Sequence, residues 1–139
     1  MRIVCDTNVL ISALLWGGTP GRILERIESG FDTLYTSRIL LQELTEVLNY
    51  PKISRTLARR NLSSNEILEL VIAHAQIVKT SNTPIRAVPS DPDDDHVIDC
   101  AVTAHADYIL TGDSHLLALK VWDSIPILSA GEYLERSAS

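Results

Sequence analysis

The chain has 139 residues, of which 45% are hydrophobic and 22% are charged, and its formal net charge is -6. This composition is typical of one domain with a substantial core, spanning residues 1–139, and it excludes disordered and fibrous classes of protein. The negative charge argues against a protein that coats nucleic acid through its overall electrostatics, since such domains are usually strongly basic.

The cysteine content and the lack of long apolar runs indicate the cellular setting. The two cysteines, Cys5 and Cys100, form neither a disulfide framework nor a metal-ligand spacing, and they suit a reduced cytosol. The first residues are typical of a short strand followed by a charge rather than of a signal peptide, and no apolar run approaches the length of a membrane span. We therefore expect a soluble, cytoplasmic protein without a membrane segment.

The first part of the chain alternates a β-rich run with helical patterns. Residues 3–5 predict a buried strand that ends at Asp6-Thr7-Asn8. Helices are expected over 9–15 and between Pro20 and Gly30. Asp6 follows the carboxyl end of the strand, which is where open α/β sheets place their ligand chemistry. Its alternative role is that of an ordinary helix cap.

The next strand, over 33–36, leads into a strongly amphipathic helix that Ser37 caps. Glu43 borders the buried stripe of this helix, whereas Glu46 faces its polar side. An acid at the edge of a core-facing stripe needs a partner, although an ordinary exposed glutamate would give the same pattern. The stripe consists of Leu40, Leu41, Leu44, Val47 and Leu48.

The segment 49–65 carries basic residues and no acid. Lys52, Arg55 and Arg59 follow helical steps of three and four residues, and Arg60 adds a further charge next to them. These four residues, which we call the basic face, form the largest basic surface that the sequence predicts. Such a face suits phosphate binding, but a solvated helix surface has the same pattern.

The second half of the chain continues the alternation. Residues 81–89 are expected to form a loop, and Pro126 suggests that the last strand lies at the edge of the sheet. Because strands and helices alternate, we predict an α/β fold with a mostly parallel sheet covered on both faces. Strands are expected at 77–78, 107–111 and 125–128, and helices begin at Ser63, Asp113 and Ser129.

Four aspartates crowd into the five positions that begin at Asp91, directly before an apolar helical pattern. Like charges this close repel each other unless a cation or solvent relieves them. The spacing of Asp91, Asp93 and Asp95 mimics a calcium loop, but His96 and Val102 occupy the positions where that loop needs glycine and glutamate. Two interpretations remain: a solvated helix start, or carboxylates that join other acids around Mg²⁺ or Mn²⁺.

Acids follow strands or begin helices elsewhere in the chain too, and a parallel sheet gathers its strand ends along one edge. Asp6, Glu43, the acids of 91–99 and Asp113 can all reach that edge. One shared metal site accounts for all of them, whereas independent helix caps in the same place would be a coincidence.

The order of these motifs resembles the PIN-domain nucleases, most closely those that act as the toxin of bacterial toxin-antitoxin pairs. Each motif is weak alone, but the ordered set is specific and spans almost the whole chain. The resemblance implies a three-layer α/β/α domain that binds Mg²⁺ or Mn²⁺ through clustered acids and cuts RNA. It also implies a homodimer and a cognate antitoxin partner. The matching residues are Asp6-Thr7-Asn8-Val9-Leu10, Glu43, Asp91-Pro92-Asp93-Asp94 and Thr111-Gly112-Asp113.

The family's catalytic, metal-binding acids carry over to four positions of this sequence. For the third position, Asp91, Asp93 and Asp95 compete with Asp94. Helical geometry favours Asp94, which shares a stripe with three apolar residues of the following helix. Asp95 instead pairs with Asp99, away from the best apolar stripe, and Asp99 either deepens the metal site or faces water. The four acids are Asp6, Glu43, Asp94 and Asp113.

Neutral and basic residues complete the expected site. Asn8, Thr7 and Thr111 are candidates for orienting the carboxylates, although hydroxyls at strand ends also satisfy local backbone groups. The basic face of Lys52, Arg55, Arg59 and Arg60 would guide RNA towards the acids. The histidines and tryptophans are interpreted as surface or packing residues: His74, His96, His105, His115, Trp16 and Trp122.

Two other functions compete with a metal-dependent ribonuclease. A phosphatase of the haloacid dehalogenase type also begins with an acid after its first strand, but it needs a second aspartate where Asn8 stands. A non-enzymatic PIN-like module for dimerisation or antitoxin binding would have the same fold with an inert acidic pocket. The presence of all four acids argues against that module.

Overall fold

The computed structural model describes residues 1–80 and 92–138, with side chains placed for 1–80 and 95–137. The predicted loop at 81–89 and Asp91 lie outside the described residues. Within them, no helix is both long enough and apolar enough to cross a membrane. The described elements are β1 (Arg2–Cys5), α1 (Thr7–Leu15), α2 (Gly18–Glu28), β2 (Thr33–Ser37), α3 (Arg38–Leu48), α4 (Pro51–Arg59), α5 (Ser64–His74), β3 (Ala75–Val78), α6 (Pro92–Thr103), β4 (Tyr108–Leu110), α7 (Ser114–Leu119), β5 (Val121–Trp122), β6 (Ile125–Leu128) and α8 (Ala130–Ala138).

The strands form one six-stranded sheet in the order β3-β2-β1-β4-β6-β5. Only the short β5 runs antiparallel to its neighbour; the other pairs are parallel. The mostly parallel sheet is therefore confirmed. Because β2, β1 and β4 are adjacent and parallel, their carboxyl ends meet at one edge of the sheet.

Helices cover the sheet on both faces, as the alternating side chains of the strands require. Ile3 and Cys5 of β1 pack with α1, α2 and α8, whereas Val4 points the other way and packs with α6 and α7. The same alternation separates Ile109 from Leu110 in β4. The three-layer α/β/α arrangement is confirmed.

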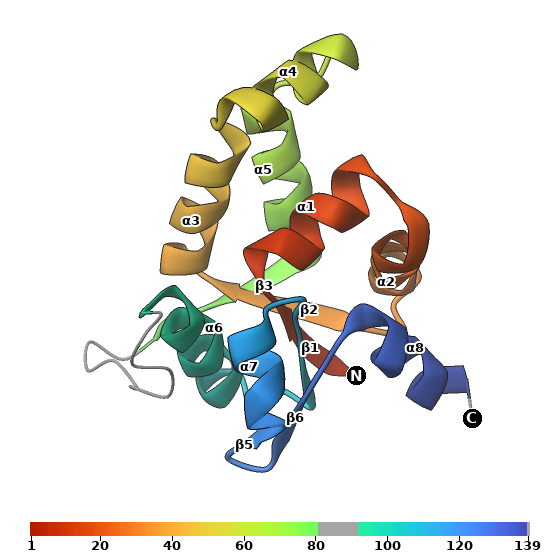
Figure 1. Cartoon of the computed structure of the whole chain (residues 1–139), viewed down its shortest axis with the longest axis vertical. Coiled ribbons are helices and arrows are strands. Elements are labelled where there is room, and N and C mark those ends of the chain that lie inside the picture. Colours follow the sequence, from red (N-terminus) through yellow and green to blue (C-terminus); the bar gives the residue numbers. More distant parts are fainter. Residues whose placement is uncertain (81–91, 139) are drawn as a thin grey trace.

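Helices α3, α4 and α5 extend away from the sheet (Figure 1). They form a separate apolar cluster with α1, in which buried leucines of α3 and α4 contact isoleucines of α1 and α5. The predicted stripe of α3 is confirmed at its centre, since Leu40, Leu44 and Leu48 are buried. This cluster connects the basic face on α4 to the sheet that positions the acids.

The predicted helix starts at Ser37 and Ser63 are confirmed, because both hydroxyls accept a hydrogen bond from a backbone N–H three residues on. Ser129 and Glu132 add a reciprocal pair at the start of α8, where each side chain accepts a backbone N–H of the other residue. These caps depend only on near neighbours in sequence, which is why the sequence predicts them well.

The prediction that Pro126 marks an edge strand is wrong. The two-residue strand β5 pairs along the outer side of β6, with Val121 opposite Pro126. The proline is tolerated because the parallel pairing with β4 begins only at Ile127. The backbone N–H of Ile127 meanwhile donates to the carbonyl of Lys120, on the β5 side.

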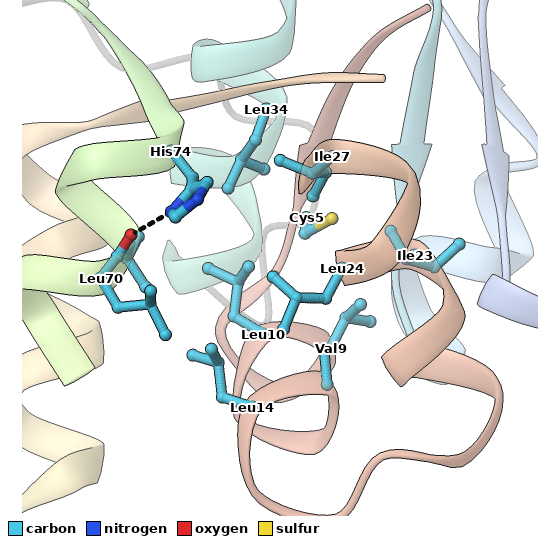
Figure 2. A pocket seen from close by; sticks show the side chains of 12 residues that line it. Cys5, Val9, Leu10, Leu14, Ile23, Leu24, Ile27, Leu34, Leu70 and His74 are labelled. Carbon is cyan, nitrogen blue, oxygen red and sulfur yellow. Dashed lines mark hydrogen bonds between the residues drawn. The ribbon is translucent and has the colours of Figure 1, made fainter. Parts of the chain in front are cut away.

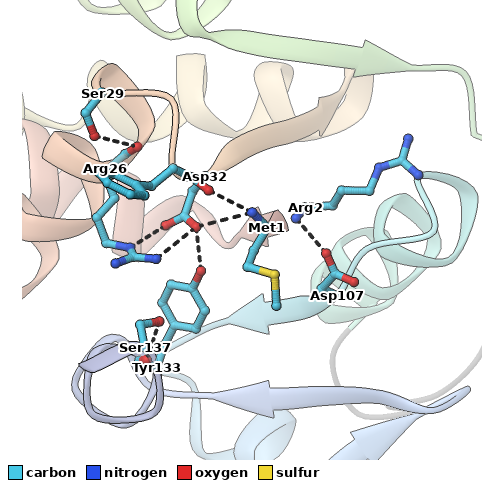
Figure 3. Close-up of polar contacts among 9 residues, drawn as sticks. Met1, Arg2, Arg26, Ser29, Asp32, Asp107, Tyr133 and Ser137 are labelled. Carbon is cyan, nitrogen blue, oxygen red and sulfur yellow. Dashed lines mark hydrogen bonds and ion pairs between the residues drawn. The ribbon is translucent and has the colours of Figure 1, made fainter. Parts of the chain in front are cut away.

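A buried ion pair lies at the opposite end of β1 from the acids (Figure 3). The side chain of Asp32 is fully buried and accepts hydrogen bonds from the guanidinium of Arg26, at 2.8 and 3.3 Å, and from the hydroxyl of Tyr133, at 2.6 Å. These bonds join α2, the start of β2 and α8. A buried charge is stable only when it is paired and hydrogen-bonded, so each donor matters.

We expect Tyr133→Phe to lower the free energy of unfolding by about 1–3 kcal/mol, because the buried carboxylate of Asp32 loses a donor. Urea denaturation measures this change. The matched control is Tyr35→Phe, whose exposed hydroxyl only accepts from Arg2 at 3.2 Å; we expect a change of no more than about 0.5 kcal/mol there. Equal effects of the two variants would contradict the structural role of the Tyr133 hydroxyl.

Candidate functional site

Asp6 stands at the carboxyl end of β1 and is buried. Its backbone N–H donates to the carbonyl of Leu110 in β4, at 3.1 Å. Its carboxylate caps α1 by accepting the N–H of Val9 at 2.8 Å, and it also accepts a hydrogen bond from the hydroxyl of Thr111. The side chain is therefore held between the end of one strand and the start of a helix.

The hydroxyl of Thr111 connects two of the predicted acids. It donates to Asp6 and accepts the backbone N–H of Asp113, at 3.0 Å. Asp113 in turn caps α7 by accepting the N–H groups of His115 and Leu116, at 2.7 and 3.2 Å. Thr111 is completely buried. The geometry suits the role predicted for it, that of orienting a carboxylate.

Burial raises the pKa of the Asp6 carboxyl group above its usual value, and the charge of Asp113 acts in the same direction. Hydrogen bonds from Thr111 and from the backbone of Val9 and Gly112 act against this rise in pKa. The pKa is raised because the ionised form is poorly solvated in this position. A cation beside Asp6 would relieve both the poor solvation and the repulsion from Asp113.

A second group of polar side chains lies between α3 and α6. The Nδ1 atom of His96 is 2.6 Å from Oε1 of Glu43, and the two side chains are 27% and 19% exposed. Asp99 follows His96 by almost one turn of α6. Burial raises the pKa of Asp99, and the nearby imidazole of His96 acts in the opposite direction. His96 thus joins α6 to the predicted acid Glu43, a contact that its interpretation as a surface or packing residue does not include.

The apolar stripe predicted for α6 is buried, but the covered surface of the helix is wider than that stripe. Asp95 and Asp99 are only 7% and 9% exposed, so they do not lie on a solvated side of the helix. The prediction used a single apolar stripe, but α6 packs on β1, β2 and β4 and also contacts α3. Its covered surface is therefore wider than one stripe. Asp94 and Asp93 belong to α6, but their side chains lie outside the described part of the chain.

The chain topology brings Asp6 and Asp113 together at the carboxyl edge of the sheet. Asp6 and Asp113 follow the neighbouring strands β1 and β4. Helix α6 leads into β4 and packs against the sheet, so it runs opposite to the strands and begins at their carboxyl edge. Among the side chains that the structure places, no three histidine, cysteine or acidic residues form a complete metal-binding group. The oxygen donors present nevertheless suit a hard ion such as Mg²⁺ or Mn²⁺.

A neutral groove of about 300 Å³ adjoins the acids. Asn8 and Ser12 of α1 line one part of it, Thr111 lies between the groove and Asp6, and the residues that begin α8 line another part. Asn8 is exposed. The groove provides hydrogen-bonding groups without adding negative charge next to the acids.

The basic face divides into two parts. Lys52, Arg55 and Arg59 are exposed on α4. The guanidinium of Arg60 instead donates to the carbonyl of Leu15, the last residue of α1. Arg60 therefore fastens α4 to α1 and stabilises the carboxyl end of that helix.

A small apolar pocket between α1, α2 and α5 does not have the chemistry of an active site (Figure 2). Aliphatic side chains from α1, α2 and α5 line a cavity of only about 20 Å³, together with Cys5 and His74. His74 donates to the carbonyl of Leu70 at 2.9 Å. Burial raises the pKa of the Cys5 thiol, so it is a poor nucleophile. The candidate site is the acidic edge of the sheet.

We expect Thr111→Val to lower the free energy of unfolding by about 1–3 kcal/mol, because Asp6 loses a donor and the N–H of Asp113 loses an acceptor. Thr111→Ser keeps the hydroxyl and should recover most of this loss. Guanidinium denaturation of the three proteins in a chelator measures the effect of the hydroxyl alone. A valine variant as stable as the wild type would show that this bond contributes nothing.

Comparisons with known proteins identify the family. The sequence matches the family model of the PIN domain over residues 2–115. It is 34% identical over 123 residues to an uncharacterised protein, MJ1680, from Methanocaldococcus jannaschii, covering 86% of this chain and 76% of that protein. The fold is similar to that of VapBC2 from Rickettsia felis bound to a DNA fragment from its promoter, with a TM-score of 0.59 and 14% identity over 91% of this chain and 97% of that one. The chain belongs to the PIN-domain family.

Proposed function

We propose that this protein is a divalent-metal-dependent endoribonuclease and the toxin of a toxin-antitoxin pair. Proteins of the PIN-domain family are generally nucleases. The observation that carries the proposal is the buried carboxylate of Asp6, which Thr111 links to Asp113 at the carboxyl edge of the sheet. A buried carboxylate beside a second, half-buried one destabilises the protein unless a cation or hydrogen bonds offset the charge. Family membership also removes the support for a phosphatase of the haloacid dehalogenase type.

The proposed metal ligands are Asp6, Glu43, Asp94 and Asp113, with Mg²⁺ or Mn²⁺ as the ion. A bound ion of this kind lowers the pKa of a water molecule and stabilises charge on the departing oxygen of a phosphodiester. Asp6 and Asp94 would hold one ion, while Glu43 and Asp113 would hold a second or act through bound water. Thr111 fixes the orientation of the Asp6 carboxylate, and Asn8 lies in the adjoining groove where substrate would contact it.

The third acid is the part of the ligand set that most needs a test. The spacing of apolar residues favours Asp94, as argued from the sequence. The competing choice is Asp95, whose side chain is placed on the covered side of α6 with 7% exposure. Asp99 is also buried and contributes further negative charge to this side of the site. Substitution of each residue in turn distinguishes these assignments.

RNA would reach the acids along the basic face of α4. The exposed cations Lys52, Arg55 and Arg59 supply phosphate contacts without sequence preference. The overall charge of -6 makes such a local cationic surface important, since most of the molecule repels the substrate. Arg60 is left out of this proposed RNA surface because it binds Leu15.

We also propose a homodimer and an antitoxin partner. The structurally similar VapBC2 is a complex by name, and this chain presents large exposed apolar residues that a protein partner would cover. Trp16 and Tyr50 are 51% and 55% exposed at the end of α1 and the start of α4. Aromatic residues of this kind are frequent at protein interfaces.

One observation favours a non-enzymatic module as the competing function. The side chains that the structure places do not by themselves form a complete metal-binding group. A PIN fold without a functional metal site would still dimerise or bind an antitoxin. The two functions differ in whether the protein binds Mn²⁺ and cuts RNA.

The first test is Mn²⁺- and Mg²⁺-dependent cleavage of a mixed RNA pool. We expect cleavage by the wild type, loss in a chelator, and a decrease of at least about 100-fold in Asp6→Asn and in Asp94→Asn. Asp123→Asn, in the exposed turn between β5 and β6, is the matched control and should retain full activity. If Asp95→Asn abolishes cleavage while Asp94→Asn does not, Asp95 is the third acid. No metal binding and no cleavage by the wild type would favour the non-enzymatic module.

Metal binding should also be visible in stability. At an Mn²⁺ concentration about 100 times the dissociation constant, the wild type should gain about 2.7 kcal/mol. Asp6→Asn should gain little, and in a chelator it should be at least as stable as the wild type because it removes a poorly solvated charge. Thermal denaturation with and without Mn²⁺ measures both effects. Equal stabilisation of the two proteins by Mn²⁺ would place the ion elsewhere.

The basic face should determine how RNA affinity depends on salt. Arg55→Gln should weaken binding and reduce the slope of log affinity against log salt by about 0.7, the value for one phosphate contact with single-stranded nucleic acid. Arg22→Gln, on the exposed side of α2, is the matched control and should leave the slope unchanged. Fluorescence anisotropy with labelled RNA at several salt concentrations gives both slopes. An equal reduction in the two variants would rule out α4 as the specific RNA surface.

A further inference from the structure

We propose that His96 is a positioning residue that holds the carboxylate of Glu43 in the orientation needed to bind a divalent ion. This inference rests on the proposed function and deepens it. It starts from a contact between two side chains that lie 53 positions apart in the sequence, on α3 and α6.

The contact between His96 and Glu43 is short and protected. Nδ1 and Oε1 are 2.6 Å apart, which lies at the short end for hydrogen bonds to a carboxylate. Both side chains are about three-quarters buried or more, at 27% and 19% exposure. An exposed ion pair on a protein surface contributes little because its long side chains remain mobile and solvated. This pair lies between two packed helices, so its geometry is constrained from both sides.

The contact with His96 restricts the conformations that the Glu43 side chain can adopt. Glutamate has three rotatable side-chain bonds, and fixing it in one conformation costs free energy when a metal arrives. His96 takes up part of this cost before binding, because the imidazole already selects one orientation of the carboxylate. Groups that orient metal ligands in this way typically change metal affinity by 10- to 100-fold when they are removed.

The imidazole is also well placed among the buried acids of α6. His96 lies next to Asp95 and three residues before Asp99 on the same helix, and all three side chains are buried or half-buried. Asp6 and Asp113 are fixed by Thr111 and by the starts of α1 and α7. Glu43 lies in the middle of α3, where no helix start is available to orient it. His96 supplies from α6 the constraint that the helix starts supply to the other two acids.

The test measures Mn²⁺ affinity by titration calorimetry in the absence of RNA, and kcat and KM for cleavage separately. His96→Ala removes the contact, whereas His96→Asn keeps a side-chain N–H donor on the same carbon as Nδ1. We expect His96→Ala to weaken Mn²⁺ binding by about 10- to 100-fold and His96→Asn to recover most of the loss. The matched control, His105→Asn, replaces an exposed histidine whose positive φ asparagine tolerates, and should bind Mn²⁺ as the wild type does.

A double-mutant cycle with Glu43→Gln shows whether His96 acts through Glu43. In the Glu43→Gln background, His96→Ala should cause no further loss of Mn²⁺ affinity. An equal loss in both backgrounds would overturn the proposal, because His96 would then act independently of Glu43, for example as a ligand itself. A lower melting temperature with unchanged Mn²⁺ affinity would overturn it too, since the contact would merely join two helices. A wild type that binds no Mn²⁺ would reject the proposed function itself, and the role of His96 with it.

Discussion

The hydrogen bonds of the Thr111 hydroxyl are the constraint on which the acidic edge of this structure depends. One buried hydroxyl serves as a donor to Asp6 and as an acceptor for the backbone of Asp113, so the ends of two adjacent strands are held in one arrangement. The carboxylates also begin helices, and each helix start supplies N–H donors in place of the water molecules that would otherwise solvate the carboxylate. Local folding rules and the proposed chemistry thus use the same oxygen atoms.

The molecule holds the cations of α4 apart from Asp6 and Asp113. These two acids follow β1 and β4, whereas Lys52, Arg55 and Arg59 lie on α4, which extends away from the sheet with α3 and α5 (Figure 1). Arg60 joins these parts by binding the end of α1. Without this separation, the arginines of α4 would pair with the acids and neutralise them. The arrangement keeps the acids available for a metal ion and the cations available for phosphate.

Features set by near neighbours in sequence could be predicted, and features set by distant packing could not. Ser37, Ser63 and Asp113 were expected to begin helices, and each does. The strand β5 is not predicted because two residues carry no usable periodicity, and Pro126 alone therefore indicates an edge that β5 in fact covers. Asp95 and Asp99 are buried on a helix that packs on the sheet and also contacts α3, and no pattern within 92–103 predicts these contacts.

The residues that contact the predicted acids show the same difference between local and distant features. Thr111 was a candidate because it lies two residues before Asp113, within reach of a local pattern. The histidines have no metal-ligand spacing, which favours a surface or packing role for His96; its partner is on another helix, and spacing along the chain does not reveal it. The signal that could have found it is the conjunction of two facts: Glu43 borders a buried stripe and needs a partner, and His96 is the basic side chain closest to the aspartate run.

The chain brings the site together from residues that are far apart in sequence, and this affects when the site can exist. The bond between Thr111 and Asp6 closes a separation of 105 residues, and that between His96 and Glu43 closes one of 53. Contacts between residues so far apart in sequence form late, because closing a long loop costs entropy before the contact can stabilise the chain. During synthesis, β1 has no β4 beside it until residue 110 has left the ribosome. An incomplete nascent chain therefore carries the first acids without the bond that orients them, and the acidic edge is assembled only when the domain is nearly complete.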